Sequence, residues 1–362
     1  MFVAWRDLRS AKGRFALMGA VVVLITLLVG LLSGLTAGLG RQNTSAITSL
    51  PAGLIAFDAP AGGEDLSYSD SAVTGEQWRR WAGTPGVRSA EPLGIAAAKA
   101  TAGDRSAGVS VFGVRPGSAL APEGDRIGGR AAVLSEPAAA GLGVAAGDTL
   151  TLAGQRLTVA AVSGDASFSH TPVVWTGLDV WRRAAPPADG PDGPAATVIA
   201  LDAAPGTDVE AADRAAGTRT VPKEESLAAI GSYASENGSL RLMRGFLFAI
   251  SALVVGAFFA VWTVQRSGDV AVLKALGAST AGLLGDALGQ AAVLLTGGTL
   301  AGAGLAAVLG ALVAGPDVPF LLTPATVLAP AAVTVALGVL GAALAVRRIT
   351  SVDPLTALGS VR

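Results

Sequence analysis

Four long runs of apolar residues interrupt an otherwise mixed pattern along the chain. They extend from about Phe15 to Leu39, from Gly245 to Val264, from Ala287 to Val313 and from Ala325 to Val346. A helix needs about 20 apolar residues to cross the roughly 30 Å hydrocarbon core of a bilayer. Each run is long enough, and four core helices of this kind in one chain would be exceptional. The pattern therefore predicts four membrane-spanning helices.

The first run also resembles a secretion signal, because basic residues precede it. Its apolar stretch is longer than the roughly 7–15 residues of a signal peptide's central region. We therefore expect an uncleaved anchor, preceded by a short amphipathic helix over residues 1–14.

Residues 40–240, between the first two runs, alternate apolar and polar positions and are rich in turn residues. Segment 147–165 is typical of a β-hairpin that turns at Ala153-Gly154-Gln155, and two short segments that carry tryptophan, Gln77–Ala82 and Leu178–Ala184, are typical of helices. A Pro/Gly-rich loop is expected at 185–195. The predicted strands are Gly108–Val114, Ala131–Leu134, Thr149–Leu152, Arg156–Val162 and Thr197–Leu201. The pattern predicts an α+β domain, and it leaves the strand order open.

The distribution of charged residues predicts the orientation of the chain in the membrane. The short flanks are basic, with +3 over residues 1–14, +1 over 265–282 and +2 over 347–362, whereas residues 40–240 hold 15 basic and 22 acidic residues. Basic flanks stay on the cytoplasmic side. We therefore expect a cell-membrane protein with both termini cytoplasmic: four transmembrane helices plus a large extracytoplasmic α+β domain between helices 1 and 2.

The composition limits the kinds of catalytic and metal-binding site that the chain can form. The chain is 51% hydrophobic and only 15% charged, with no cysteine and one histidine, His170. Disulfides and thiolate metal sites are excluded, and a His-rich metal site or a Ser-His-Asp triad is disfavoured. The net charge of −1 gives no indication of a nucleic-acid partner. We expect no catalytic site, no metal site and no cofactor of the chain's own.

The loop between the second and third runs, 265–282, carries the signals of a short helix. Ser267 can cap it, Asp269 lies in its first turn and Gly277 can end it. Its apolar residues recur every three positions, at Val270, Leu273 and Leu276. Such a helix either rests on lipid or docks into another protein, and the pattern leaves both alternatives open.

Three segments together carry a family resemblance. The run R-S-G-D-V-A-V-L-K-A-L-G-A-S at 266–279, the ending R-R-I-T-S-V-D-P-L-T-A-L at 347–358 and the opening A-W-R-D-L-R-S-A-K-G-R-F-A-L at 4–17 are similar to segments of FtsX/MacB-type ABC transporter permeases. The family commonly has Glu where Asp269 stands. The order of one span, a large external domain and three further spans is also similar.

The resemblance implies a homodimer in the membrane that works with two cytoplasmic ATPase subunits. The 362 residues contain no G-x-x-x-x-G-K-[ST] motif, so ATP is expected to bind to that partner. The residues expected to form the coupling contact with the ATPase are Arg266, Asp269, Leu273, Lys274 and Gly277.

Small residues in the first run predict close helix packing. Gly30, Gly34 and Gly38 form two overlapping G-x-x-x-G steps on one face, and Gly298 and Gly302 repeat the spacing in the third run. Dimerisation and packing within the chain are both consistent with these steps.

Segment 14–52 resembles the first span and outer junction of Gram-positive haem-efflux permeases of the HrtB/DevC-like group. That resemblance implies export of haem, which would enter sideways from the outer leaflet. Glu236, Tyr233 or Met243 would then supply an iron ligand, and Arg41 or Arg244 would meet the propionates. The simpler alternatives are a solvated Glu236 and an interface-anchoring Arg244. His170 lies in the Ser/Thr-rich turn 167–171, where we expect it to be exposed and not a ligand.

Three rival functions stay open at this stage. The chain could export lipids, lipopeptides or antimicrobial peptides, or transmit a signal to cell-wall hydrolases as FtsX proper does, although the external domain is large for that role. A membrane-anchored enzyme is the weakest rival, because residues 40–240 show no nucleophile elbow and no metal-ligand spacing.

Overall fold

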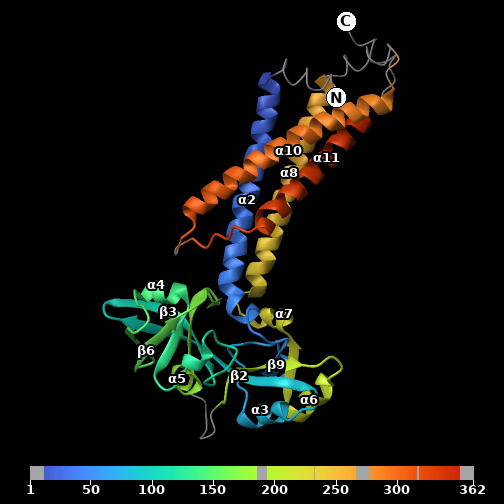
Figure 1. Ribbon diagram of the computed structural model, residues 1–362. Coiled ribbons are helices and arrows are strands. Elements are labelled where there is room, and N and C mark those ends of the chain that lie inside the picture. Colours follow the sequence, from blue (N-terminus) through green and yellow to red (C-terminus); the bar gives the residue numbers. More distant parts are fainter. Residues whose placement is uncertain are drawn as a thin grey trace. The chain divides into compact units, whose positions relative to one another are not determined.

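The computed structural model describes residues 12–185, 194–231, 233–265, 277, 279–315 and 318–350 (Figure 1). The chain divides into two compact units. One comprises residues 1–38 with 239–362, the other residues 39–238. Of the coupling segment 265–282 that the sequence predicts, Gln265, Gly277 and residues 279–282 are described, and the rest lies outside the described residues.

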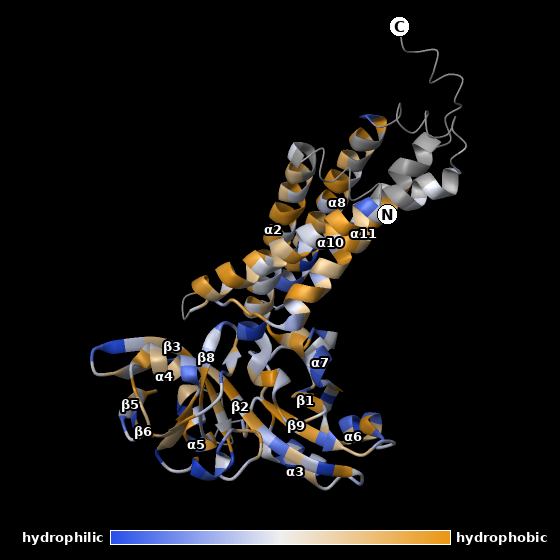
Figure 2. Cartoon of the chain, turned by 45° about the horizontal axis from the view of Figure 1, so that its top comes forward, coloured by the Kyte–Doolittle hydropathy of each residue, from blue (hydrophilic) through white to orange (hydrophobic). Residues whose placement is uncertain are grey.

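Four long helices are apolar enough to cross a membrane within the described part of the chain. They are α2 (Lys12–Thr48), α8 (Tyr233–Gln265), α10 (Thr280–Val313) and α11 (Pro324–Thr350). Hydrophobic residues colour much of the described length of these helices in Figure 2. Many of their large apolar side chains are exposed, including Leu24, Leu253 and Leu312. Exposed apolar helix surface of this extent is what a bilayer covers. The predicted four-helix membrane architecture is confirmed.

The first two helices are longer than the predicted spans 15–39 and 245–264. Helix α2 continues through the polar residues to Thr48, and α8 begins at Tyr233. The extension of α2 buries Asn43, Ala46 and Ile47 on one face. A hydropathy pattern records where apolar residues become sparse, and an amphipathic helix continues past that point.

Glycines let the membrane helices approach closely. A Cβ on Gly30 would lie 2.8 Å from Ala306 Cβ, and one on Gly34 would lie 2.3 Å from the Phe320 ring. A Cβ on Gly38 would overlap the carbonyl oxygen of Pro319. All three glycines therefore lie against other segments of the same chain.

The same arrangement holds for the second glycine pair. On α10, a Cβ on Gly298 would lie 2.8 Å from Val22, and one on Gly302 would lie 2.6 Å from the Val23 carbonyl oxygen of α2. Glycine is thus required where the backbones of α2 and α10 cross.

The second unit is built on a ten-stranded sheet in the order β10-β1-β9-β2-β3-β8-β4-β6-β5, with β7 paired to β8. The strands are β1 Leu54–Asp58, β2 Val87–Ala102, β3 Arg105–Val114, β4 Ala131–Leu134, β5 Thr149–Leu152, β6 Gln155–Val162, β7 Ser167–Phe168, β8 Thr171–Gly177, β9 Val198–Ala203 and β10 Thr218–Pro222. The helices are α3 Gly75–Ala82, α4 Glu136–Leu142, α5 Leu178–Ala184, α6 Val209–Ala216 and α7 Lys223–Ser226. The predicted α+β class is confirmed.

Strand β2 joins two halves of the sheet. Its first half, Val87–Leu93, pairs with β9, and its second half, Gly94–Ala102, pairs with β3. At its far end, Ala100 and Thr101 pair with β5, so the strands β2-β3-β8-β4-β6-β5 form a closed ring. Its strands contribute to two buried clusters, and β10-β1-β9 with the first half of β2 form an open wing that continues from the ring.

An aromatic chain fills the core beside the end of α2. Tyr68 lies edge-on to Phe57 and Phe168, with ring centroids 4.9 and 5.5 Å apart. Phe112 lies edge-on to Phe168 and Trp175, at 5.6 and 5.0 Å. Ile47 and Leu50 belong to the same buried cluster. The end of α2 is therefore part of the core of this unit.

A Gly302→Ala substitution should destabilise the helical unit. The new methyl would press on the Val23 backbone, which cannot rotate away, and overpacking of this kind costs about 1–3 kcal/mol. Thermal unfolding of the chain in lipid nanodiscs measures the effect. Gly304→Ala on the same helix is the control, because its Cβ meets nothing within 4 Å and alanine favours helix. Equal melting temperatures for the two variants would contradict the packing described.

Candidate functional site

The candidate site lies at the outer end of α2, where the β7–β8 turn meets it. Phe168 pairs with Thr171, so Ser169 and His170 form a two-residue hairpin turn. Both have positive φ, 48° and 64°. A turn with two left-handed residues is the type I′ hairpin turn, for which Asn-Gly is the usual sequence. Here neither position is glycine.

The turn is bonded to α2 through its backbone. The amide of Ser169 donates to the Asn43 carbonyl at 3.0 Å, and the amide of His170 donates to the Gln42 carbonyl at 3.1 Å. These carbonyls lie within a helix, so each accepts from outside the helix as well. The turn is thereby fixed in register against α2.

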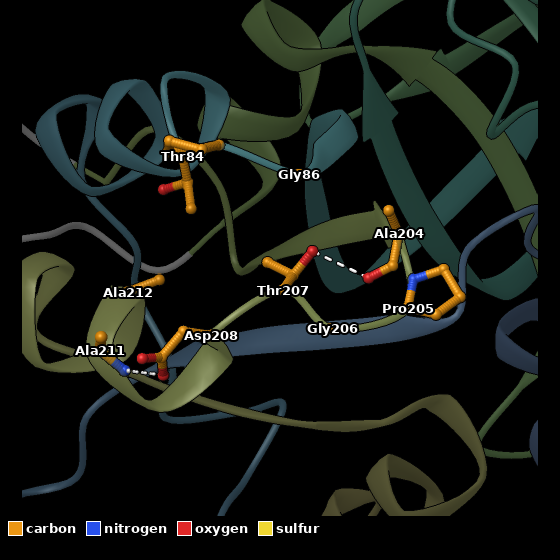
Figure 3. Close-up of a pocket in the computed structure, with 10 residues that line it drawn as sticks. Thr84, Gly86, Ala204, Pro205, Gly206, Thr207, Asp208, Ala211 and Ala212 are labelled. Atoms are coloured by element: carbon orange, nitrogen blue, oxygen red, sulfur yellow. Dashed lines mark hydrogen bonds between the residues drawn. The ribbon is translucent and has the colours of Figure 1, made fainter.

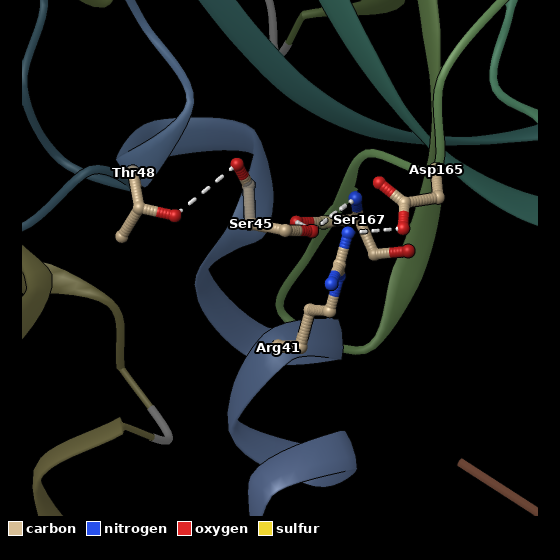
Figure 4. Close-up of polar contacts among 5 residues, drawn as sticks. All are labelled: Arg41, Ser45, Thr48, Asp165 and Ser167. Carbon is tan, nitrogen blue, oxygen red and sulfur yellow. Dashed lines mark hydrogen bonds and ion pairs between the residues drawn. The ribbon is translucent and has the colours of Figure 1, made fainter. Parts of the chain in front are cut away.

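Side chains of α2 add two further attachments, shown in Figure 4. Ser45 Oγ accepts from the Ser167 amide at 2.9 Å and donates to the Ser167 carbonyl at 3.2 Å. Arg41 forms an ion pair with Asp165. Both members of that pair are about half exposed, so the pair contributes at most about 1 kcal/mol. The predicted propionate ligand Arg41 is thus engaged within the chain.

Two polar side chains, one from the β7–β8 turn and one from α2, converge on a carboxylate oxygen of α8. His170 Nε2 lies 2.8 Å from Glu236 Oε2, and Asn43 Nδ2 donates to the same oxygen at 3.0 Å. Asn43 is 2% exposed, His170 31% and Glu236 41%. The imidazole is therefore half-buried and paired, and the expectation that it is exposed was wrong.

The error has a plain physical cause. His170 and Glu236 are 66 residues apart, and nothing in the local Ser/Thr-rich sequence indicates that its turn folds back onto α2. Glu236 is likewise not simply solvated, because the first turn of α8 places it against both partners. Tyr233, three residues earlier, packs against the aromatic core, and its amide donates to the Ile230 carbonyl at 2.9 Å.

The remaining predicted ligands, Met243 and Arg244, belong to the helical unit. Met243 is 51% exposed. Arg244 Nη2 donates to Thr36 Oγ1 of α2 at 2.6 Å, and its Nε is buried without a hydrogen-bond partner among the described residues. A guanidinium with an unused donor inside a membrane helix favours an anionic ligand.

Of the predicted coupling residues, only Gly277 is described. Its φ of 91° is one that other residues rarely adopt, so the chain needs glycine there. Arg266, Asp269, Leu273 and Lys274 lie outside the described residues. Within the described part of the chain, no group of three His, Asp or Glu side chains could hold a metal ion.

The shifted pKa values in the described part of the external unit include those of Tyr68 and Asp202. Burial raises the pKa of Tyr68, whose hydroxyl donates to Ser226 Oγ at 2.9 Å, so it stays neutral. A hydrogen bond from Arg88 lowers the pKa of Asp202. Both groups serve the fold, since one lies in the core and the other joins β2 to β9.

A surface hollow of about 600 Å³ lies between the end of α3 and the start of α6 (Figure 3). Its lining is mostly small residues and backbone. Asp208 already caps α6 by accepting from the Ala211 amide at 2.9 Å, and Thr207 Oγ1 donates to the Ala204 carbonyl at 2.8 Å. The polar side chains of the lining named above already form hydrogen bonds within the fold, so the hollow presents few groups that could bind a ligand.

Two family models match the chain. The MacB-like periplasmic core domain matches residues 15–219, and the FtsX-like permease C-terminal domain matches residues 242–354. Together they cover both structural units.

The similar relatives include proteins named as hemin transport system permease HrtB. The one from Staphylococcus haemolyticus is 26% identical over 217 residues, which is 59% of this chain and 60% of that protein. The one from Staphylococcus epidermidis is 28% identical over 146 residues, 40% of this chain and 41% of that protein. The chain thus spans less than two thirds of either relative.

A solved structure, the extracellular domain of the noncanonic ABC-type transporter YknZ from Gram-positive bacteria, is also similar. It is 13% identical with a TM-score of 0.35, over 47% of this chain and 98% of that domain.

A Ser169→Gly substitution should stabilise the external unit. A left-handed non-glycine residue costs about 1–2 kcal/mol, and the greater freedom of glycine in the unfolded chain removes part of the gain. We expect about 0.5–1 kcal/mol, measured by denaturant unfolding. Ser106→Gly, at an exposed position near the start of strand β3, should instead destabilise by a similar amount. A loss of stability in Ser169→Gly would contradict the strain assigned to the turn.

Proposed function

Because the chain belongs to the FtsX/MacB-type family of ABC transporter permeases, we propose that it is the membrane subunit of an export complex for haem or a similar flat amphiphile. The hemin transport permeases among its relatives support haem as the substrate. The four apolar helices and the external β-rich unit supply the architecture.

Energy comes from a separate ATPase in this proposal. The 362 residues lack the phosphate-binding motif that an ATPase requires. The amphipathic segment with Arg266, Asp269, Leu273, Lys274 and Gly277 is the contact proposed for that partner, on the basic, cytoplasmic side. Two copies of the chain and two ATPase subunits would form the complex, with both termini cytoplasmic.

The observation that carries the substrate class is Arg244. Its guanidinium lies within a membrane-spanning helix, bonds to Thr36 and keeps a buried Nε without a partner among the described residues. Haem is an apolar disc with two carboxylates, so it partitions into lipid and offers the anion that this group lacks. Charge-assisted bonds of this kind are worth about 1.5–3 kcal/mol.

The direct test is the ATPase activity of the chain with its partner ATPase in lipid nanodiscs, titrated with haemin. Saturable stimulation by haemin, and none by a lipopeptide of similar size, is the expected result. Stimulation by the lipopeptide alone would overturn the haem assignment in favour of a lipid or peptide exporter. Stimulation by neither, with cell-wall hydrolase activity dependent on the chain, would favour a signal transmitter.

An Arg244→Gln substitution should raise the haemin concentration for half-maximal stimulation by about 10–100-fold, because the charge-assisted bonds to the propionates are lost. The maximal rate should change little. Arg241→Gln is the matched control, since Arg241 is exposed one turn earlier on the same helix. Haemin dimethyl ester, which lacks both carboxylates, should bind the two variants equally. Equal haemin dependence in both variants would contradict the role of Arg244.

A further inference from the structure

The ring of Phe320 is wedged between two helices of the helical unit. Phe320 lies between α10 and α11 in the sequence, and this connection passes α2 in Figure 1. A Cβ on Gly34 of α2 or on Gly310 of α10 would overlap the tip of the ring, at Cζ and Cε1. One turn earlier on both helices the contact is direct, since a Cβ on Gly30 would lie 2.8 Å from Ala306 Cβ. The ring therefore fills the space that opens between α2 and α10 beyond this contact.

The backbone on either side of the ring is also held against α2. Leu321 donates its amide to the Gly34 carbonyl at 3.1 Å. Pro319 lies so close to Gly38 that a Cβ on this glycine would overlap the proline carbonyl oxygen. Thr326 Oγ1, in the first turn of α11, donates to the Leu321 carbonyl at 3.0 Å. The segment therefore lies along the face of α2 that carries these two glycines.

The opposite face of the same turn of α2 contacts Arg244. Successive residues of an α-helix are about 100° apart around its axis, so Thr36 is turned about 160° from both Gly34 and Gly38. Thr36 is 5% exposed, and its Oγ1 accepts from Arg244 Nη2 at 2.6 Å. At this level α2 is thus held between the guanidinium of α8 on one side and the Phe320 ring on the other.

This arrangement closes the buried part of the guanidinium to a ligand. The Nε of Arg244 is buried without a partner among the described residues. A shift of α2 away from α8 at Thr36 is the simplest movement that would expose it. The Phe320 ring lies on the side toward which α2 would move, so the seated ring opposes that shift. Glycine offers no side chain to interlock with the ring, so the ring can leave without repacking its neighbours.

We propose that Phe320 is a positioning residue that controls access to Arg244. With the ring seated, α2 is held against α8 and the guanidinium is closed to anions. With the ring displaced, α2 shifts and Arg244 binds a carboxylate of the exported amphiphile. The proposal rests on the proposed function, in which Arg244 binds that carboxylate. When the competent conformation makes up about 10% or less of the free protein, the apparent affinity is about tenfold or more weaker than that of the open site.

The test is a Phe320→Ala substitution in the chain with its partner ATPase in lipid nanodiscs. The haemin concentration for half-maximal stimulation should fall by about tenfold, and the maximal rate should change little. A ring that served only the stability of the bundle would give no such gain, because lost packing weakens binding or leaves it unchanged. Phe246→Ala is the matched control and should behave as the wild type, since the Phe246 ring on α8 is 61% exposed. An unchanged or higher half-maximal concentration in Phe320→Ala overturns the proposal.

Gly34→Ala unseats the ring by a different route. Its methyl would occupy the position of the ring tip, so the half-maximal haemin concentration should fall as it does in Phe320→Ala. The double variant should match either single variant, because both changes act on one contact and their effects do not add. Additive effects would show that the two residues act separately, against the proposal.

Haemin dimethyl ester distinguishes control of Arg244 from a general loosening of the bundle. The ester lacks both carboxylates, so Phe320→Ala should leave its half-maximal concentration unchanged. In an Arg244→Gln background, Phe320→Ala should likewise bring no gain for haemin. An equal gain for haemin and its ester would mean that the ring does not act through Arg244, and the proposal would fall.

The role of Phe320 and the proposed function fail in different ways. A wild-type complex that haemin stimulates, with a response that Phe320→Ala does not alter, overturns the role of Phe320 and leaves haem export standing. If an anionic lipopeptide stimulates in place of haemin, the same variants are compared with it, and the same shift decides. A wild-type complex that neither compound stimulates overturns both.

Discussion

The attachment of the β7–β8 turn to the last turns of α2 is the constraint on which the external unit depends. Helix α2 is a membrane-spanning helix by composition, yet its end contributes Ala46 and Ile47 to the aromatic core. Backbone bonds from Ser169 and His170, and the reciprocal bonds between Ser45 and Ser167, fix the helix in register with the sheet. The candidate site exists because this register brings the imidazole to the first turn of α8.

A second constraint is the continuous strand β2, which belongs to both the closed ring and the open wing. Near the point where the strand passes from the wing to the ring, glycines let a neighbouring side chain pack directly on the backbone. A Cβ on Gly94 or Gly113 would lie 2.2 or 2.4 Å from Trp181, so the indole of α5 rests directly on the backbones of β2 and β3. Ring and wing thus share strand β2, and the indole of Trp181 packs on that strand where the ring begins.

Features set by local pattern could be predicted from the sequence. The four apolar runs gave the membrane helices. Strands β4 and β5 have the predicted bounds because a short apolar run in β4, the alternation in β5 and nearby glycines are local signals. Features that depend on contacts between residues far apart in the sequence could not be predicted. Strand β2 was missed because its alanine-rich sequence has few β-branched residues, only Val87, Ile95 and Thr101. The pairing of His170 with Glu236 joins residues distant in sequence through a turn without glycine. The continuation of α2 beyond residue 39 was missed because one face of that segment is polar. The continuous apolar run that marks the span in the sequence therefore ends before the helix does.

Closure of the ring also bears on how the protein avoids unwanted association. A sheet edge exposes unpaired amides and carbonyls to which strands of other molecules can add. The pairing of Ala100 and Thr101 with β5 removes two such edges at once. In the described sheet the open edge is β10, which is short and ends in Pro222, a residue without an amide proton to donate. A domain that faces the cell exterior, beyond the reach of cytoplasmic chaperones, is thereby protected against edge-to-edge aggregation by its own topology.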